Sequence, residues 1–197
     1  MSWIELPAIP ACRFKLIGTP IELAVIVRVV PDGDERDKDV ANGIRYAVDN
    51  GAKVINMSFG KGYSYNKTLV DDAVKYAADH DVLMVHAAGN DGQDNDTHNN
   101  FPNDTYADGS GTAPNWIEVG ACGPTFNPAD FSNYGKKGVD LFAPGEEIYS
   151  TVPTDEYKNL QGTSMDSPVV AGVAALIRSY FPTLSAVQVK QILMESV

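Results

Sequence analysis

The sequence predicts an α/β fold in three layers, with a mostly parallel sheet flanked by helices. Apolar, β-branched runs alternate with stretches of helical spacing along residues 24–88. This alternation is typical of strand–helix units whose strands pair in parallel. A later run, residues 169–177, holds no charged or strongly polar side chain, which predicts a helix buried on nearly every side. The 197 residues, 44% of them hydrophobic, suffice for one sizeable core.

The N-terminal part begins with a segment that carries no clear pattern. Residues 1–23 show neither alternation nor helical spacing, and they stay an unassigned tail. Residues 24–30 form an apolar run that ends at a Pro-Asp-Gly turn, so a buried strand is expected there. Asp39 is the expected N-cap of the next helix, and Gly51 stands where a C-terminal cap belongs.

The strand–helix pattern then repeats. A strand is expected at residues 54–59, a helix around residues 69–77 and an apolar strand at residues 82–88. A long polar loop, residues 90–115, separates these elements from a further strand at residues 116–121. Loops of this length are usually functional or disordered.

The C-terminal part predicts one more strand at residues 139–143, followed by two helices. The first is the apolar helix at residues 169–177. The second starts at Ser185, with Gln188 three residues later as the partner in a capping box.

Charge and composition exclude several classes of partner. The net charge of −11, with no Lys or Arg between residues 77 and 135, disfavours a nucleic-acid partner. The acidic residues of that stretch are compatible with a structural calcium ion or with a solvated loop, and both interpretations stay open. They are Asp91, Asp94, Asp96, Asp104 and Asp108.

Cysteines and apolar runs say little about location. Cys12 and Cys122 cannot build a disulfide framework or a four-cysteine zinc site. The short apolar run at residues 6–12 lacks the basic start of a signal peptide, and no run reaches membrane-spanning length. The chain is expected to be soluble, with its cellular location undecided.

A serine at the entrance of the apolar helix is the strongest candidate for chemistry. Ser164 lies in a Gly-Thr-Ser-Met segment directly before that helix. Unpaired backbone N–H groups and the helix dipole at such an entrance stabilise developing negative charge, which suits a nucleophile whose attack creates an oxyanion. In isolation the same segment is better explained by simple helix capping than by catalysis.

Two strand ends supply further candidates. Asn90 follows the strand at residues 82–88, at the carboxyl edge where open α/β sheets bind ligands. Its amide can donate a hydrogen bond to a tetrahedral intermediate, although Asn before Asp-Gly is also a common turn sequence. Ser58, in the Asn-Met-Ser-Phe-Gly segment, closes the neighbouring strand at the same predicted edge, where backbone groups could bind extended substrate.

Together and in this order, these segments resemble the subtilisin family of serine endopeptidases over residues 24–196. The resemblance implies that residues 24–197 are the C-terminal part of a subtilisin-like peptidase domain. It implies a polypeptide substrate, no required cofactor, and a secreted or cell-envelope location. It further implies that Ser164 is the nucleophile, that Asn90 is the oxyanion donor, and that the pocket walls are Ser58, Phe59, Gly60, Ala87, Ala88 and Gly89.

The sequence also departs from the family. The family's Asp-Ser-Gly (or Asp-Thr-Gly) and His-Gly-Thr-His motifs lie upstream of the strand matched by residues 24–30, and neither motif is present. Because a serine hydroxyl is a weak nucleophile without an adjacent base, the chain is expected to be inactive alone. An upstream segment would have to supply Asp and His.

The three histidines and Asp166 are the remaining polar residues of interest. His86 lies within a predicted strand, His80 ends a helix and His98 sits in the acidic loop, so none is assigned a catalytic role. Asp166 stands where the family commonly has alanine, and its side chain is expected to point away from Ser164.

Two functions from different classes therefore remain. The first is a serine endopeptidase completed by upstream sequence. The second is a non-catalytic module that keeps the peptide-binding groove but has lost the triad. A dinucleotide-binding domain is excluded because no Gly-x-Gly-x-x-Gly motif follows the early strands.

Overall fold

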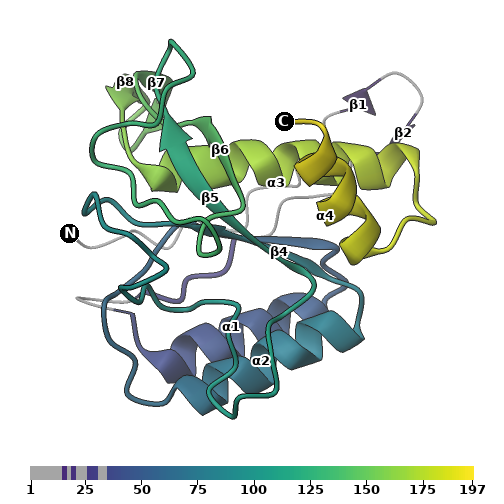
Figure 1. Ribbon diagram of the computed structural model, residues 1–197. Coiled ribbons are helices and arrows are strands. Elements are labelled where there is room, and N and C mark those ends of the chain that lie inside the picture. The colour runs from purple at the N-terminus through teal and green to yellow at the C-terminus, as the bar shows by residue number, and fades with distance from the viewer. Residues whose placement is uncertain (1–14, 17–18, 21–25, 31–34) are drawn as a thin grey trace.

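A four-stranded parallel sheet lies between two pairs of helices (Figure 1). The structure is a computed structural model that describes residues 15–16, 19–20, 26–30 and 35–197. Neighbouring strands pair in chain order: β3 (Val54–Met57), β4 (Leu83–Ala87), β5 (Trp116–Cys122) and β6 (Leu141–Pro144). One face is covered by α1 (Asp37–Asp49) and α2 (Lys67–Asp79), the other by α3 (Thr163–Tyr180) and α4 (Ala186–Glu195). The predicted three-layer α/β architecture is confirmed.

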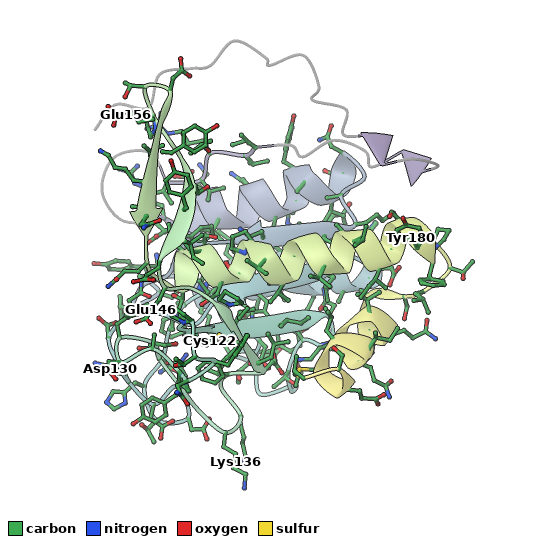
Figure 2. All side chains as sticks on the ribbon, turned by 90° about the horizontal axis from the view of Figure 1, so that it is seen from above. Cys122, Asp130, Lys136, Glu146, Glu156 and Tyr180 are labelled. Atoms are coloured by element: carbon green, nitrogen blue, oxygen red, sulfur yellow. The ribbon has the colours of Figure 1, made fainter. Side chains whose placement is uncertain are left out.

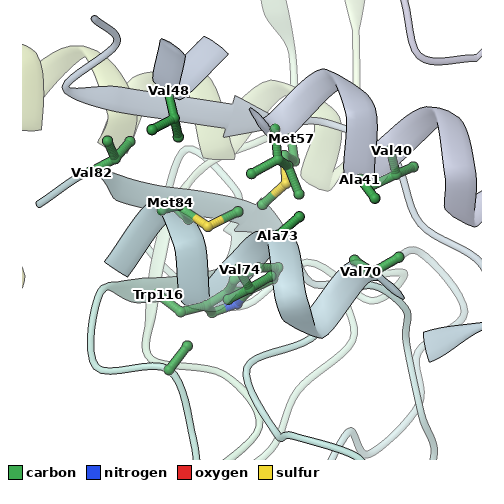
Figure 3. Close-up of a cluster of buried hydrophobic side chains, with 13 residues drawn as sticks. Val40, Ala41, Val48, Met57, Val70, Ala73, Val74, Val82, Met84 and Trp116 are labelled. Atoms are coloured by element: carbon green, nitrogen blue, oxygen red, sulfur yellow. The ribbon is translucent and has the colours of Figure 1, made fainter. Parts of the chain in front are cut away.

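Alternation along the central strands divides the core in two. In β4, Met84 belongs to the cluster under α1 and α2, while Leu83 and Val85 belong to the cluster under α3 and α4. Figure 3 shows the first cluster, in which Trp116 of β5 fills the space beside Met84 and Val74. Full burial of an apolar side chain contributes about 1.5–3 kcal/mol. These two layers hold the strand ends at a common edge.

Helix α1 begins three residues earlier than expected, so the prediction of Asp39 as its N-cap is wrong. The N-cap is Arg36, without a side-chain cap, and Asp39 lies in the first turn. The Asp37 carboxylate instead accepts hydrogen bonds from the Asn66 backbone at 2.6 Å and the Ser64 hydroxyl at 3.0 Å, and it pairs with Lys61 at 2.7 Å. Gly51 follows the helix with a φ of +82°, as a C-terminal glycine should.

The strand expected at residues 24–30 is not observed in its described part. Residues 26–30 form no strand, and none of the named strands pairs with them. Residues 24–25 lie outside the described part. Within the expected tail, β1 (Lys15–Leu16) and β2 (Thr19–Pro20) form a short antiparallel pair.

An antiparallel hairpin that was not expected precedes α3. It consists of β7 (Ile148–Val152) and β8 (Glu156–Leu160), and it projects from the end of α3 with Glu156 near its tip (Figure 2). All five residues of β8 are exposed. Tyr149 and Tyr157 stack on it, with ring centroids 5.6 Å apart.

The prediction that residues 169–177 are buried on nearly every side is wrong for the described chain. One face of α3 packs on the sheet through Val170, Ala171 and Ala174. The opposite face leaves Val169, Val173 and Leu176 between 39% and 43% exposed. The apolar composition would allow burial on every side of the helix, but the described residues bury only the face that packs on the sheet.

The last helix follows its sequence signals. The Ser185 hydroxyl accepts from the Gln188 backbone while the Gln188 side chain accepts from the Ser185 backbone, so the predicted capping box is present. None of the helices within the described ranges combines the length and apolarity needed to cross a bilayer.

Candidate active site

Ser164 lies in the first turn of α3, where helix amides have no intrahelical acceptor. The turn is entered through Gly162, whose φ of +140° is accessible to glycine and strained for other residues. The half-buried Ser164 hydroxyl donates to the Ser58 carbonyl at 3.1 Å. Two segments separated by 106 residues along the chain are thus in contact at the serine.

Asn90 is held beside this turn by Thr163, the residue before Ser164. Its Oδ1 atom accepts from the Thr163 backbone at 2.8 Å and from the Thr163 hydroxyl at 3.0 Å. Because a backbone N–H can only donate, the accepting atom must be oxygen, and this sets the orientation of the amide. The Asn90 NH₂ group is left on the other side of the carboxamide, available as a donor.

Thr163 is a functional residue that the sequence reasoning passed over. It is fully buried, and its hydroxyl also accepts from the Gly89 backbone at 3.1 Å. It therefore ties the end of β4 to the start of α3. The sequence signal that could have indicated Thr163 was its position between a glycine and the candidate nucleophile.

The strand end at residues 87–89 is covered by asparagine side chains. The Ala87 carbonyl accepts from Asn100 at 3.0 Å, and the Ala88 carbonyl from Asn95 at 3.0 Å and Asn133 at 2.9 Å. Ala87 and Ala88 are buried. Gly89 has a φ of +106°, and a Cβ there would lie 2.5 Å from the Asn133 amide nitrogen.

Asn133 organises the turn that carries Asn90. Its Oδ1 atom accepts from the Asp91 and Gln93 backbones, both at 3.0 Å. The side chain is only 3% exposed, so it acts as an internal brace and not as a surface group. Nothing in its Phe-Ser-Asn-Tyr-Gly segment indicated this role from the sequence.

The opposite segment, Ser58 to Gly60, follows the end of β3. The Ser58 hydroxyl accepts from Asn56 at 2.8 Å and lies 3.0 Å from the hydroxyl of Ser167 in α3. The segment after β3 therefore contacts α3 through both the backbone and the side chain of Ser58. The structure brings together at one edge the Ser58 segment, Asn90 and Ser164, as the sequence predicts.

The chain has three histidines, and all three are engaged away from Ser164. His80 Nδ1 lies 2.8 Å from the Tyr76 carbonyl, and His98 Nδ1 lies 2.9 Å from the Thr97 hydroxyl. His86 is fully buried between β3 and β5. Ser164 thus has no imidazole base from this chain.

Asp166, in the first turn of α3, has no counter-charge. The residue is fully buried, and neither carboxylate oxygen has a hydrogen-bond partner. Burial raises the pKa of Asp166 to about 9, against the opposing effect of the Ser167 amide, and the charge of Glu118 adds to the rise. The side chain is neutral at pH 7 and cannot serve as the missing anion of a triad.

The acidic loop uses its carboxylates as local anchors. Asp96 accepts from the backbones of Lys137 at 2.8 Å and Gly138 at 2.7 Å, which lowers the pKa of Asp96. Asp108 pairs with Lys75 at 2.6 Å. Across the described ranges, no three His, Cys, Asp or Glu side chains converge where a metal ion could bind.

Fold and site together define a class of protein. A serine at a helix entrance meets an amide at the carboxyl end of a central parallel strand, and the two are linked through Thr163. On a three-layer α/β scaffold this arrangement is that of the subtilisin-like serine peptidases.

Comparison with known proteins places the chain within that class. A model described as the Subtilase family matches residues 22–197, so the chain belongs to the subtilase family. Thermitase from Thermoactinomyces vulgaris is 46% identical over 166 residues, which are 83% of this chain and 54% of thermitase. Subtilisin DY from Bacillus licheniformis is 42% identical over 153 residues, 77% of this chain and 52% of that protein.

The fold is shared with solved structures as well. The crystal structure of a cold adapted subtilisin-like serine proteinase matches with a TM-score of 0.70 at 35% identity, over 83% of this chain and 56% of that chain. The chain therefore spans about half the length of the relatives that it matches.

Proposed function

We propose that this chain carries the nucleophile and the oxyanion site of a serine endopeptidase. Ser164 attacks the carbonyl carbon of a peptide bond, and the resulting oxyanion is stabilised by the Asn90 amide and the Ser164 backbone N–H. A histidine base from an upstream segment takes the proton of the Ser164 hydroxyl during the attack and gives it to the leaving amine. The same base then activates the water that hydrolyses the acyl-enzyme and releases Ser164. All groups in this scheme are protein groups, so the reaction needs no cofactor.

The observation that supports this proposal most directly is the link between Thr163 and Asn90. The Asn90 oxygen accepts from the backbone N–H of Thr163, the residue directly before the nucleophile, at 2.8 Å. The Asn90 NH₂ group therefore lies on the other side of the carboxamide. An amide placed in this way costs no reorganisation when the oxyanion forms.

The base in this proposal comes from outside the present sequence. All three histidines of the chain are engaged elsewhere, and the Ser164 hydroxyl donates to a backbone carbonyl that cannot take its proton. We therefore infer that an upstream segment supplies a histidine as the base and an aspartate to orient it. The chain by itself is expected to have little or no peptidase activity.

Labelling with a serine-directed fluorophosphonate tests the assignment. The expected result is weak labelling of the chain alone and strong labelling at Ser164 once the upstream segment is supplied. Ser164→Ala should abolish it, whereas Ser179→Ala, at the far end of the same helix, should not. Absence of label at Ser164 in both preparations would overturn the catalytic assignment.

A second function is favoured by the resting contact of the nucleophile. The Ser164 hydroxyl is satisfied by the Ser58 carbonyl without any base, as expected for a module that binds peptides without cleaving them. Saturable peptide binding without turnover in the complete natural protein would support this alternative. Turnover that disappears in Ser164→Ala would exclude it.

The family resemblance extends to substrate and surroundings. We propose a polypeptide substrate that lies between the Ser58–Gly60 segment and the end of β4, in a secreted or cell-envelope enzyme. A structural calcium ion in the acidic loop stays a prediction, because the carboxylates that would bind it serve as backbone anchors or ion-pair partners in this structure.

A further inference from the structure

A buried histidine connects the two strand ends of the proposed groove. His86, in β4, is fully buried, with its ring between those of Phe59 and Trp116. Its Nε2 atom lies 2.7 Å from the Phe59 carbonyl. Its Nδ1 atom lies 2.9 and 3.0 Å from the two carboxylate oxygens of Glu118 in β5. A histidine in an otherwise apolar strand is thus engaged at both ring nitrogens.

The chemistry of these partners determines where the protons lie. A carbonyl oxygen only accepts, so Nε2 must carry a hydrogen and donate it to Phe59. Between Nδ1 and the Glu118 carboxylate there must then be one further proton. Glu118 is itself held by the Trp116 indole N–H at 2.8 Å. Glu118 of β5 therefore orients the His86 ring, and the Nε2–H group of the ring points toward the Phe59 carbonyl, just after the end of β3.

The contact falls where the backbone most needs support. Strand β3 ends at Met57, and among the named strands it pairs only with β4. Phe59 lies beyond the last ladder pair, directly after Ser58, whose carbonyl accepts from Ser164. No strand hydrogen bond holds the segment after Met57. The His86 side chain, from the neighbouring strand β4, supplies a donor to this segment instead.

We propose that His86 is a positioning residue of the Ser164 site: with Glu118 behind it, its Nε2–H fixes the Phe59 carbonyl and so orients the Ser58–Gly60 wall toward the substrate. This inference rests on the proposed peptidase function only for its substrate. The anchoring itself is a property of the chain, and it can be measured without catalysis.

The decisive variant replaces both members of the pair. Changing His86 alone would leave Glu118 buried without its partner, which threatens folding. His86→Phe together with Glu118→Leu substitutes apolar groups of similar size. It removes the donor to Phe59 and also the acceptor of the Trp116 indole N–H, while no buried charge is left without a partner. Glu118→Gln is the conservative variant, because a glutamine amide can donate to Nδ1 while its oxygen still accepts from Trp116.

The first measurement is amide hydrogen exchange of the isolated chain. The amides of Lys61 and Phe101 donate to each other's carbonyls at 3.0 and 2.8 Å, directly after the anchored segment. The double variant should exchange these two amides faster by about tenfold, the effect of losing one hydrogen bond of about 1.4 kcal/mol. Glu118→Gln should restore most of the protection. Val74→Ala, in the buried cluster that contains Trp116, is the control for a general loss of stability. It should not accelerate exchange of these amides selectively.

The second measurement is peptide hydrolysis by the enzyme completed with its upstream segment. The double variant should raise KM for a peptide by about tenfold with kcat changed by less than about threefold, since the wall contacts substrate and not the reacting bond. A small fluorophosphonate that does not reach the wall should label Ser164 at an unchanged rate.

Each outcome decides one of the two proposals. Unchanged exchange of the Lys61 and Phe101 amides in a folded double variant, or loss of protection in Glu118→Gln equal to that in the double variant, overturns the role of His86. If the double variant does not fold, nitrogen NMR of His86 in the unaltered chain decides, and an Nε2 atom without hydrogen overturns it. Absence of Ser164-dependent turnover, with selective exchange still observed, would overturn the peptidase function and leave the anchor standing.

Discussion

Asn90 combines two roles that belong to different atoms of one side chain. Its oxygen holds Thr163 at 2.8 Å, and its NH₂ group is the proposed donor to the oxyanion. A substitution that keeps the first role and removes the second separates structure from chemistry.

Asn90→Asp is that substitution. The carboxylate still accepts from Thr163 but cannot donate, so kcat of the completed enzyme should fall by at least about 10²–10³-fold, a range measured for a member of this family. The melting temperature should change little. Thr163→Ser, which keeps the hydroxyl, should preserve both activity and melting temperature. A decrease in kcat below tenfold for Asn90→Asp would contradict the oxyanion role.

Asp166 should make the protein less stable as pH rises. Its pKa is raised by burial to about 9, whereas the unfolded value is near 3.8. The native state therefore holds a proton that the unfolded state releases, so stability is complete below about pH 4 and declines until about pH 9.

Asp166→Ala should remove this decline. At about 1.4 kcal/mol per unit, the free energy of unfolding at pH 7 should rise by about 2–4 kcal/mol after allowance for the small cavity. Urea denaturation at several pH values measures it. Asp130→Ala, at an exposed carboxylate, is the control. A pH slope in Asp166→Ala equal to that of the unaltered chain would show that the buried carboxyl is not its source.

At the level of elements, the start of α1 depends on a carboxylate that caps a neighbouring loop. Burial on its own raises the pKa of Asp37, but hydrogen bonds from Lys61, Asn66 and Ser64 outweigh it and lower the pKa. The stabilisation is therefore present above pH 4 and is lost as pH falls through the lowered pKa.

Asp37→Asn should destabilise the protein by about 2 kcal/mol, the contribution of hydrogen bonds to a charged group. Part of the acid-induced loss of stability should disappear with it. Asp39→Asn, in the same turn but less buried, should change the free energy of unfolding by less than about 0.5 kcal/mol. Chemical denaturation at pH 7 and pH 3 compares the two. Equal effects of the two variants would contradict the role of Asp37.

Elements with strong periodicity could be predicted from the sequence, and those defined by distant contacts could not. The strands at residues 83–87 and 116–122 are apolar enough to be evident, and the Ser185 capping box is local. The hairpin β7–β8 was not predicted, because neither strand has a buried face that would produce an alternation of apolar and polar residues in the sequence. The role of Asp37 could not be predicted, because the loop residues that it binds lie more than twenty residues away along the chain.

The same division holds for the site. Ser164, Asn90 and Ser58 stand in recognisable segments, and the structure brings their segments together. The supporting contacts of Thr163, Asn133 and His86 join residues far apart in sequence. The spacing of residues along the chain cannot predict these contacts, because they depend on which strands become neighbours in the sheet.

At the scale of the whole molecule, α3 presents an apolar face that the described residues leave partly exposed. Figure 2 shows this helix lying along the sheet from the hairpin to Tyr180. Val169, Val173 and Leu176 lie along its outer side. Exposed apolar patches of this kind promote association, so the chain alone is expected to be aggregation-prone.

Val173→Gln combined with Leu176→Gln should reduce that association without loss of stability. Light scattering and sedimentation of the isolated chain measure the association, and denaturation measures the free energy of unfolding, which should change by less than about 1 kcal/mol. Val170→Gln, on the buried side of the same helix, should instead unfold the protein, because an amide would replace a core side chain. Unaltered association in the exposed-face variant would show that another surface is responsible.

The strand order has a consequence for how the protein is made. Strands β3 to β6 are added side by side in the order of synthesis, and α3, which carries Ser164, contacts all four of them. A nascent chain that has left the ribosome as far as β6 can assemble its sheet while its nucleophile is still unmade. The proposed hydrolytic centre would close last, after the scaffold that restrains it is in place.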